Sequence, residues 1–180
     1  MLQIFHDTKT GAGTELDNHV ATITMDFSQK TVKDIEITQK QFRFKCKRCS
    51  TLCCKLGGPI ITEEEAKKIQ QTGVDIKDFV EPPHKSNHKI VGTLKSNKDG
   101  SCVFLKFDPE QNVYKCGIYD QRPNLCKIYP FRFEKIGATK VAVKIIPCCL
   151  GLNSPEGLEV NAQFVTDVLI EPLLQTINLL

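Results

Sequence analysis

Four cysteines within nine residues are the feature of this sequence that most restricts its fold. They form the run Cys46-x-x-Cys49-x-x-x-Cys53-Cys54. Two cysteines separated by two residues are typical of a metal knuckle, in which a tight turn brings both sulfurs to one ion. A regular helix would hold the first and third cysteines of this run ~10 Å apart along its axis. The run therefore predicts a loop or knuckle that leads into a helix.

The adjacent pair Cys53-Cys54 needs a separate explanation. Neighbouring side chains point to opposite faces of an extended chain and diverge by ~100° in a helix. The two thiols are therefore expected to differ in role. Either they serve two metal positions, or one of them ligates and the other packs.

Five further cysteines follow the run, and they bring the total to nine: Cys102, Cys116, Cys126, Cys148 and Cys149. Residues 1–20 lack the apolar core of a signal peptide, and no window approaches the ~18 apolar residues of a membrane span. We therefore expect a cytoplasmic protein without a membrane segment. Disulfides are rare in that compartment, and an odd number of cysteines cannot all pair within the chain, so metal or cluster ligation is favoured.

The composition is that of a folded domain. The chain has 180 residues, of which 41% are hydrophobic and 25% charged, and its net charge is +3. These values exclude a disordered or low-complexity chain. So small a net charge, with few aromatic residues among the basic ones, gives no indication of nucleic-acid binding. A redox or other protein partner is compatible with the sequence.

Periodicity predicts a small α+β domain with short antiparallel strands, hairpins and a few helices around a cysteine-rich core. Apolar residues alternate over 21–27, which predicts a strand, and a second strand is expected over 33–38. Thr62 and Glu65 have the spacing of a capping box, which predicts a helix over 62–72. Short strands are expected over 90–94, 103–107 and 113–114, and a hairpin over 131–135 and 141–146.

The final segment is expected to be helical. Ser154 is interpreted as its N-cap and Pro155 as its first residue, with Leu158, Ala162, Val165 and Leu169 on the face that covers the core. The chain then divides into a strand-rich N-terminal extension (1–41) packed on the same domain, a cysteine-cluster metal-binding domain (42–152) and a C-terminal helix (153–180).

All four arginines lie near cysteines in the sequence. Arg122 precedes Pro123 and is within reach of both Cys116 and Cys126. Metal-bound thiolates keep net negative charge, which a guanidinium offsets while it donates hydrogen bonds to sulfur. Arg122 is therefore predicted to contact the bound cofactor.

Three blocks of residues resemble the YkgJ-type cysteine-cluster family, whose CxxCxxCC domains are described as zinc- or iron-chelating. The first runs from Phe44 to Cys54 and is followed by the acidic helix start at Thr62. The second, which is the most specific, contains Cys102-Val103-Phe104-Leu105, Cys116-Gly117-Ile118-Tyr119, Arg122-Pro123, Cys126 and Tyr129-Pro130-Phe131. The third is Cys149-Leu150-Gly151. Together these blocks cover roughly residues 42–152, and the resemblance implies metal chelation without specifying a reaction.

The sequence departs from the family pattern at three places. Three residues instead of two precede the double cysteine, which leaves open whether Cys53 or Cys54 takes the family's ligand position. Val103 stands where the family prefers proline, and Lys127 where it prefers arginine. The predicted metal ligands are Cys46, Cys49, Cys53, Cys54, Cys102, Cys116, Cys126 and Cys149, with Cys148 as the spare thiol.

Three functions follow from this reading. An iron–sulfur cluster, of the 4Fe–4S type, would serve redox or cluster-dependent chemistry. Zinc in two closed sites would instead stabilise a module that only binds partners. A thiol enzyme that uses Cys53-Cys54 or Cys148-Cys149 is the third possibility, but no base lies nearby in the sequence. Whether the chain is an enzyme stays open.

Overall fold

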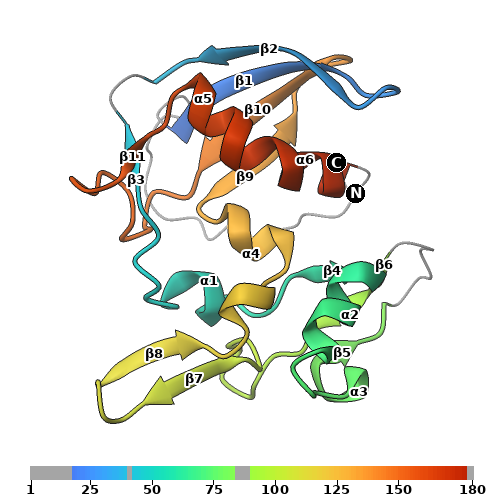
Figure 1. The fold of residues 1–180 in the computed structure, drawn as a ribbon, viewed down its shortest axis with the longest axis vertical. Helices are drawn as coiled ribbons and strands as arrows, with labels where there is room; N and C mark the ends of the chain where they lie inside the picture. Colours follow the sequence, from blue (N-terminus) through green and yellow to red (C-terminus); the bar gives the residue numbers. More distant parts are fainter. Residues whose placement is uncertain (1–17, 40–41, 84–89, 178–180) are drawn as a thin grey trace.

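The computed structural model describes residues 18–39, 42–83 and 90–177. Figure 1 shows two parts stacked along the long axis, an upper part with a four-stranded sheet and a lower part with small sheets and short helices. Each part has its own hydrophobic core. The predicted α+β class is therefore confirmed.

The upper part is built on an antiparallel sheet with the strand order β2-β1-β10-β9. Its strands are β1 (His19–Asp26), β2 (Thr31–Ile37), β9 (Phe131–Lys135) and β10 (Lys140–Ile145). The alternating segment 21–27 thus forms a central strand, and Ile23 and Val141 are partners in its register with β10. The predicted hairpin over 131–135 and 141–146 is also confirmed.

The C-terminal helix packs on this sheet (Figure 1). It consists of α5 (Ala162–Phe164), π-helical turns over Val165–Leu169 and α6 (Ile170–Thr176). Val165, Leu169 and Leu173 are fully buried in the core that the sheet provides. The π-helical turns precede Pro172, which has no N–H to donate and whose ring would collide with a carbonyl one turn earlier.

The predicted start of this helix is wrong. Asn161 is the N-cap, and its side chain accepts a hydrogen bond from the N–H of Phe164 at 2.9 Å. Ser154 and Pro155 lie in turns, and β11 (Leu158–Glu159) pairs with β3 (Arg43–Phe44). Leu158 is 65% exposed, so it does not belong to the core-facing stripe. Pairing with a distant strand overrides the local helix signal of Ser-Pro.

The lower part contains a small sheet with the order β4-β6-β5 and two helices beside it. Thr62 caps the longer helix with both hydrogen bonds of the predicted capping box. The core here includes Ile61, Ile69, Phe79 and Leu94. The elements are β4 (Ile60–Thr62), α2 (Glu63–Gln70), α3 (Ile76–Phe79), β5 (Val80–Glu81) and β6 (Ile90–Leu94).

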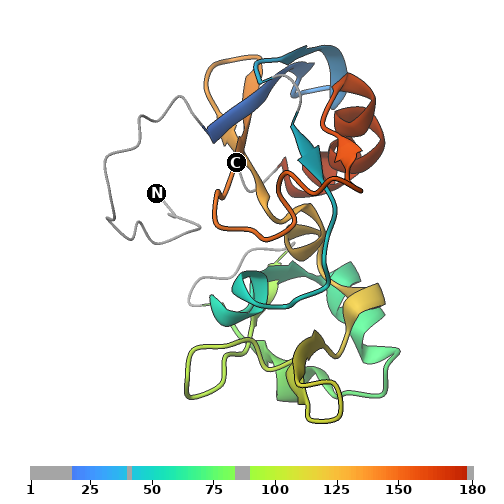
Figure 2. The ribbon, with the colours of Figure 1, turned by 90° about the vertical axis from the view of Figure 1, so that its left-hand side faces the viewer.

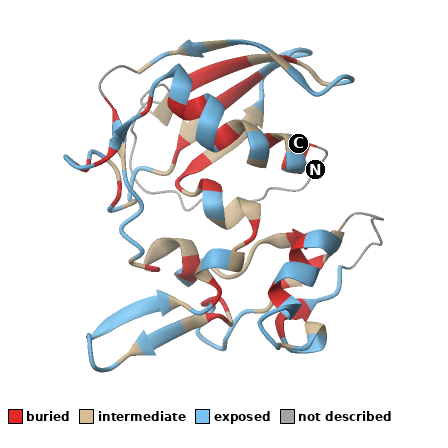
Figure 3. Ribbon diagram, viewed as in Figure 1, coloured by how far each residue is buried: buried red, intermediate tan, exposed pale blue. Residues whose placement is uncertain are grey.

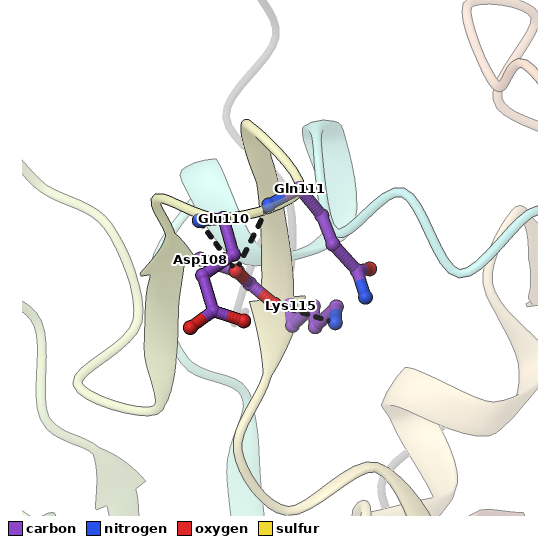
Figure 4. Close-up of polar contacts among 4 residues, drawn as sticks. All are labelled: Asp108, Glu110, Gln111 and Lys115. Atoms are coloured by element: carbon purple, nitrogen blue, oxygen red, sulfur yellow. Dashed lines mark hydrogen bonds and ion pairs between the residues drawn. The ribbon is translucent and has the colours of Figure 1, made fainter.

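A separate hairpin joins β7 (Leu105–Asp108) to β8 (Val113–Cys116), so β7 begins two residues later than predicted. Asp108 stabilises the turn, as Figure 4 shows. One of its oxygens accepts the backbone N–H groups of Glu110 and Gln111 at 3.0 and 3.1 Å. The other forms an ion pair with Lys115 at 2.7 Å.

Two short helices lie where the upper and lower parts meet (Figures 1 and 2). They are α1 (Leu52–Lys55), which follows the chain down from β3, and α4 (Asn124–Ile128), which leads up into β9. Figure 3 shows that buried residues concentrate in the upper sheet with its helix and around α2 below. Within the described ranges, no helix has the length and apolar character needed to cross a membrane.

Candidate metal centre

A cavity of about 50 Å³ lies between the two hydrophobic cores. Phe44 from the upper part and Leu94 and Ile118 from the lower part contribute to its wall. One water molecule needs ~10–15 Å³ of cavity volume, so this cavity can hold a small inorganic ligand such as a metal ion or cluster. It is too small for a large organic substrate. All eight predicted ligand cysteines and Arg122 line this cavity, whereas Cys148 is exposed and is not among its lining residues.

The first four cysteines reach the cavity from a loop and the helix that follows it. Residues 45–50 have no regular structure, and Cys53 and Cys54 lie in α1, as the spacing predicts. Arg48 and Ser50 take the left-handed backbone conformation, with φ of 52° and 47°. Non-glycine residues seldom adopt it, and here Ser50 is buried while the Arg48 guanidinium lies over the ring of Tyr119. Cys46 is exposed, whereas Cys54 is buried.

The later cysteines come from four different places in the fold. Cys102 donates its backbone N–H to the carbonyl of Cys54 at 2.7 Å, which ties it directly to α1. Cys116 ends β8, and Cys126 lies on α4. The Cys149 Sγ accepts the N–H of Gly151 at 3.4 Å. The cavity therefore brings together thiols that lie far apart in the sequence.

Cys54 occupies a central position among these thiols. Its Sγ is 3.9 Å from that of Cys53. A hydrogen bond from Cys54 lowers the pKa of Cys116 to about 6 and that of Cys53 to about 7, and the Arg122 guanidinium favours both thiolates. The hydrogen bonds of Cys54 to Cys116 and Cys53, together with burial, raise its own pKa. Cys53 and Cys116 are therefore the thiols of this set that ionise more readily, and Cys54 is the one that retains its proton.

Burial is the main influence on the pKa values of Cys126 and Cys149. It raises the pKa of Cys126, and the thiolates of Cys102, Cys116 and Cys53 raise it further. Burial also raises the pKa of Cys149, where the contributing thiolates are Cys49, Cys46 and Cys53. We call Cys53, Cys54, Cys102, Cys116 and Cys126 the inner group, and Cys46, Cys49 and Cys149 the outer group.

Tyr119 connects the cavity wall to its arginines. Its hydroxyl donates a hydrogen bond to Cys46 Sγ at 3.6 Å. The guanidinium carbons of Arg122 and Arg48 lie 3.8 and 4.2 Å from the centre of its ring. Such cation–π contacts hold positive charge beside the thiols. The sequence indicated Arg122 at this site, but neither Tyr119 nor Arg48 was predicted to take part.

Two buried polar atoms on the cavity wall have no hydrogen-bond partner among the described residues. They are Arg122 Nε and the Tyr129 hydroxyl oxygen. Burial, with added repulsion from the thiolates of Cys149, Cys148, Cys53 and Cys49, raises the pKa of Tyr129 and keeps its proton in place. Eight sulfur donors and two unused hydrogen-bond donors supply the chemistry of a metal centre whose bound sulfurs accept hydrogen bonds, although among the described residues these side chains do not stand in a ligating arrangement.

Other candidate ligands are few. His19 lies on β1, where its Nε2 is 2.8 Å from the carbonyl of Ala21, and it is not part of the cavity wall. The other three histidines lie outside the described residues. Among the described residues, no group of three or more His, Cys, Asp or Glu side chains stands in an arrangement that holds a metal ion.

Comparison with known families agrees with this chemistry. Residues 45–154 match the family model of the CxxCxxCC domain, which is described as "Putative zinc- or iron-chelating domain". The chain therefore belongs to the CxxCxxCC family. The matched region begins one residue before Cys46 and includes all nine cysteines. A search of curated proteins and a search of solved structures gave no match.

Proposed function

We propose that cysteines of the cavity hold an iron–sulfur centre of the 4Fe–4S type, and that the chain carries out redox or cluster-dependent chemistry. The observation that carries this proposal is that eight thiols, from Cys46 to Cys149 in the sequence, line one cavity. A 4Fe–4S cluster needs four thiolates, and the inner group alone offers five thiols. The outer group, with Cys46 exposed, offers a side of the centre that faces the surface.

The charges around the cavity support this assignment. Four thiolates bound to a cluster leave it with net negative charge, which would be costly to bury without compensation. Arg122 and Arg48 bring two guanidiniums to the wall, and the described residues that line the cavity include no acidic side chain. Hydrogen bonds and nearby positive charge also help to set the reduction potential of such a cluster.

A zinc-stabilised interaction module is the second candidate, and the number of thiols favours it. Eight cysteines suffice for two closed tetrahedral sites, which would contribute folding energy without catalysis. Two closed zinc sites would each need four sulfurs within ~4 Å of one another. The shared cavity, with Cys53 electrostatically coupled to both groups, favours one polynuclear centre instead.

The proposed function also has consequences for the cellular location and the partners of the protein. Nine free thiols persist in a reducing compartment, which supports a cytoplasmic location. Redox chemistry would require a protein or small-molecule partner that exchanges electrons with the centre. The exposed Cys46 marks the side of the cavity where such an exchange would take place.

The test is a metal and sulfide analysis of the chain purified without oxygen. Iron and acid-labile sulfide in equal amounts, together with a broad absorption band near ~400 nm, are expected of a thiolate-bound cluster. One or two zinc ions per chain, without sulfide, would contradict the iron–sulfur proposal and support the zinc-stabilised module. Protein that takes up neither metal when supplied with ferrous iron and sulfide, or with zinc, would overturn both candidates.

A further inference from the structure

Tyr129 lines the thiol cavity, and its buried hydroxyl has no hydrogen-bond partner among the described residues. More than nine in ten buried polar groups in folded proteins do have a partner, because an unmade hydrogen bond is costly. Arg122 Nε is in the same situation on the same wall. Two hydrogen-bond donors without partners in residues that line one small cavity indicate that the ligand of this cavity accepts hydrogen bonds.

The surrounding chain limits where the Tyr129 hydroxyl can turn. Tyr129 directly follows α4 and lies three residues after Cys126, so the two side chains extend from neighbouring positions at the end of that helix. Ile128, Pro130 and Phe131 on either side are buried. The carbonyl of Pro130 accepts the N–H of Ile146 at 2.9 Å, which fastens this segment to the chain that follows β10.

The candidate acceptors at this position are sulfur atoms. Cys49, Cys53, Cys126 and Cys149 line the cavity together with Tyr129. A neutral thiol is a weak acceptor, whereas a thiolate or sulfide bound to a metal carries negative charge and accepts more strongly. The hydroxyl therefore gains its partner when the centre is loaded.

We infer that Tyr129 is a positioning residue of the metal centre, whose hydroxyl donates a hydrogen bond to a metal-bound sulfur beside the Arg122 Nε–H. This inference rests on the proposed function. Tyr129 would not bind the metal itself. Its hydroxyl would stabilise the bound metal by donating a hydrogen bond to one of the sulfurs. Partners of this kind around metal sites typically change metal affinity by ~10–100-fold when they are removed.

The chain contains three tyrosines, which supply matched variants. Tyr129→Phe removes only the hydroxyl that faces the cavity. Tyr114→Phe is the control, because Tyr114 is 42% exposed on β8 and does not line the cavity. Tyr119→Phe removes the hydrogen bond to Cys46, which belongs to the outer group. Comparison of this variant with Tyr129→Phe shows whether loss of a hydroxyl near the outer group changes metal release in the same way.

The experiment follows metal release from the full chain purified without oxygen, with excess EDTA as the competitor. Tyr129→Phe should lose its iron or zinc about 10-fold faster than the wild type, and Tyr114→Phe should match the wild type. Equal release rates for Tyr129→Phe and the wild type would overturn the inference while the proposed function stands. A wild type that holds no metal would instead defeat the proposed function.

Thermal melting of the same proteins, with and without metal, gives a readout that a purely structural role would not produce. Without metal, Tyr129→Phe should melt at the wild-type temperature or above it, because a hydroxyl without a partner has been removed. With metal it should melt below the wild type. Unfolding of metal-free Tyr129→Phe under conditions where the metal-free wild type stays folded would contradict the inference, since the hydroxyl would then support the fold itself.

Discussion

The backbone N–H of Asn124 donates a 2.7 Å hydrogen bond to Oε1 of Glu65, across 59 residues of sequence. The other oxygen, Oε2, accepts the backbone N–H of Thr62 at 2.8 Å within the capping box. One buried carboxylate thus joins the beginnings of α2 and α4. Because α4 carries Cys126, this carboxylate links the capping box to the wall of the metal centre.

Glu65→Ala should therefore lower the free energy of unfolding by about 2–3 kcal/mol, since it removes a cap and leaves the N–H of Asn124 without its acceptor. Urea denaturation monitored by circular dichroism measures the change. Glu64→Ala is the matched control, because Glu64 is exposed and its loss should stay within about 0.5 kcal/mol. Equal losses in the two variants would show that the link between the helices contributes nothing.

Substitution of cysteines should separate the thiols of the cavity from the one outside it. Cys116→Ser removes a central thiol of the inner group and should abolish most of the bound metal, because serine is a poor ligand for zinc and for iron–sulfur clusters. Cys148→Ser should retain the wild-type metal content, because Cys148 is exposed and does not line the cavity. Elemental analysis after purification without oxygen provides the measurement, and a loss of metal in Cys148→Ser would contradict the assignment of the spare thiol.

Arg122 should stabilise the loaded centre through charge and through its Nε–H. Arg122→Ala is expected to release metal to a chelator about 10-fold faster than the wild type. Arg122→Lys should fall between the two, because lysine keeps the charge but not the planar fork of donors. Arg132→Ala serves as the control, since Arg132 lies on β9 and is not among the lining residues of the cavity. Wild-type release from Arg122→Ala would exclude this role.

Gly151→Ala should disturb the outer group by steric contact. A Cβ at Gly151 would lie 2.5 Å from the carbonyl oxygen of Lys45, which is too close for the neighbouring chain to stay in place. The N–H of Gly151 also donates to Cys149 Sγ, so the shift would separate Cys149 from the loop that carries Cys46. We expect a lower melting temperature and faster metal release.

Gly137→Ala is the control for this change, because a Cβ at Gly137 meets nothing within 4 Å. Its melting temperature should equal that of the wild type. If Gly151→Ala behaved like Gly137→Ala in both measurements, the close approach of the Cys149 loop to Lys45 would not matter for the site.

Local signals in the sequence predicted much of the secondary structure. The alternation over 21–27 became β1, and Thr62 with Glu65 formed the capping box of α2. Such signals succeed because they depend on residues a few positions apart. The predicted helix start at Ser154 failed because Leu158 pairs with Phe44, more than a hundred residues away in the chain. A backbone hydrogen-bonded to a distant strand cannot follow its local preference.

By itself, the sequence determined the chemistry available to this protein: nine thiols, a family pattern over most of the chain and an arginine among the cysteines. Only the tertiary structure decided that eight of those thiols share one cavity, that Cys148 lies outside it, and that Tyr119 and Tyr129 reach it. The reason is physical. Residue type sets what a side chain can bind, whereas the cavity exists only where the two hydrophobic cores, α1 and α4 pack together.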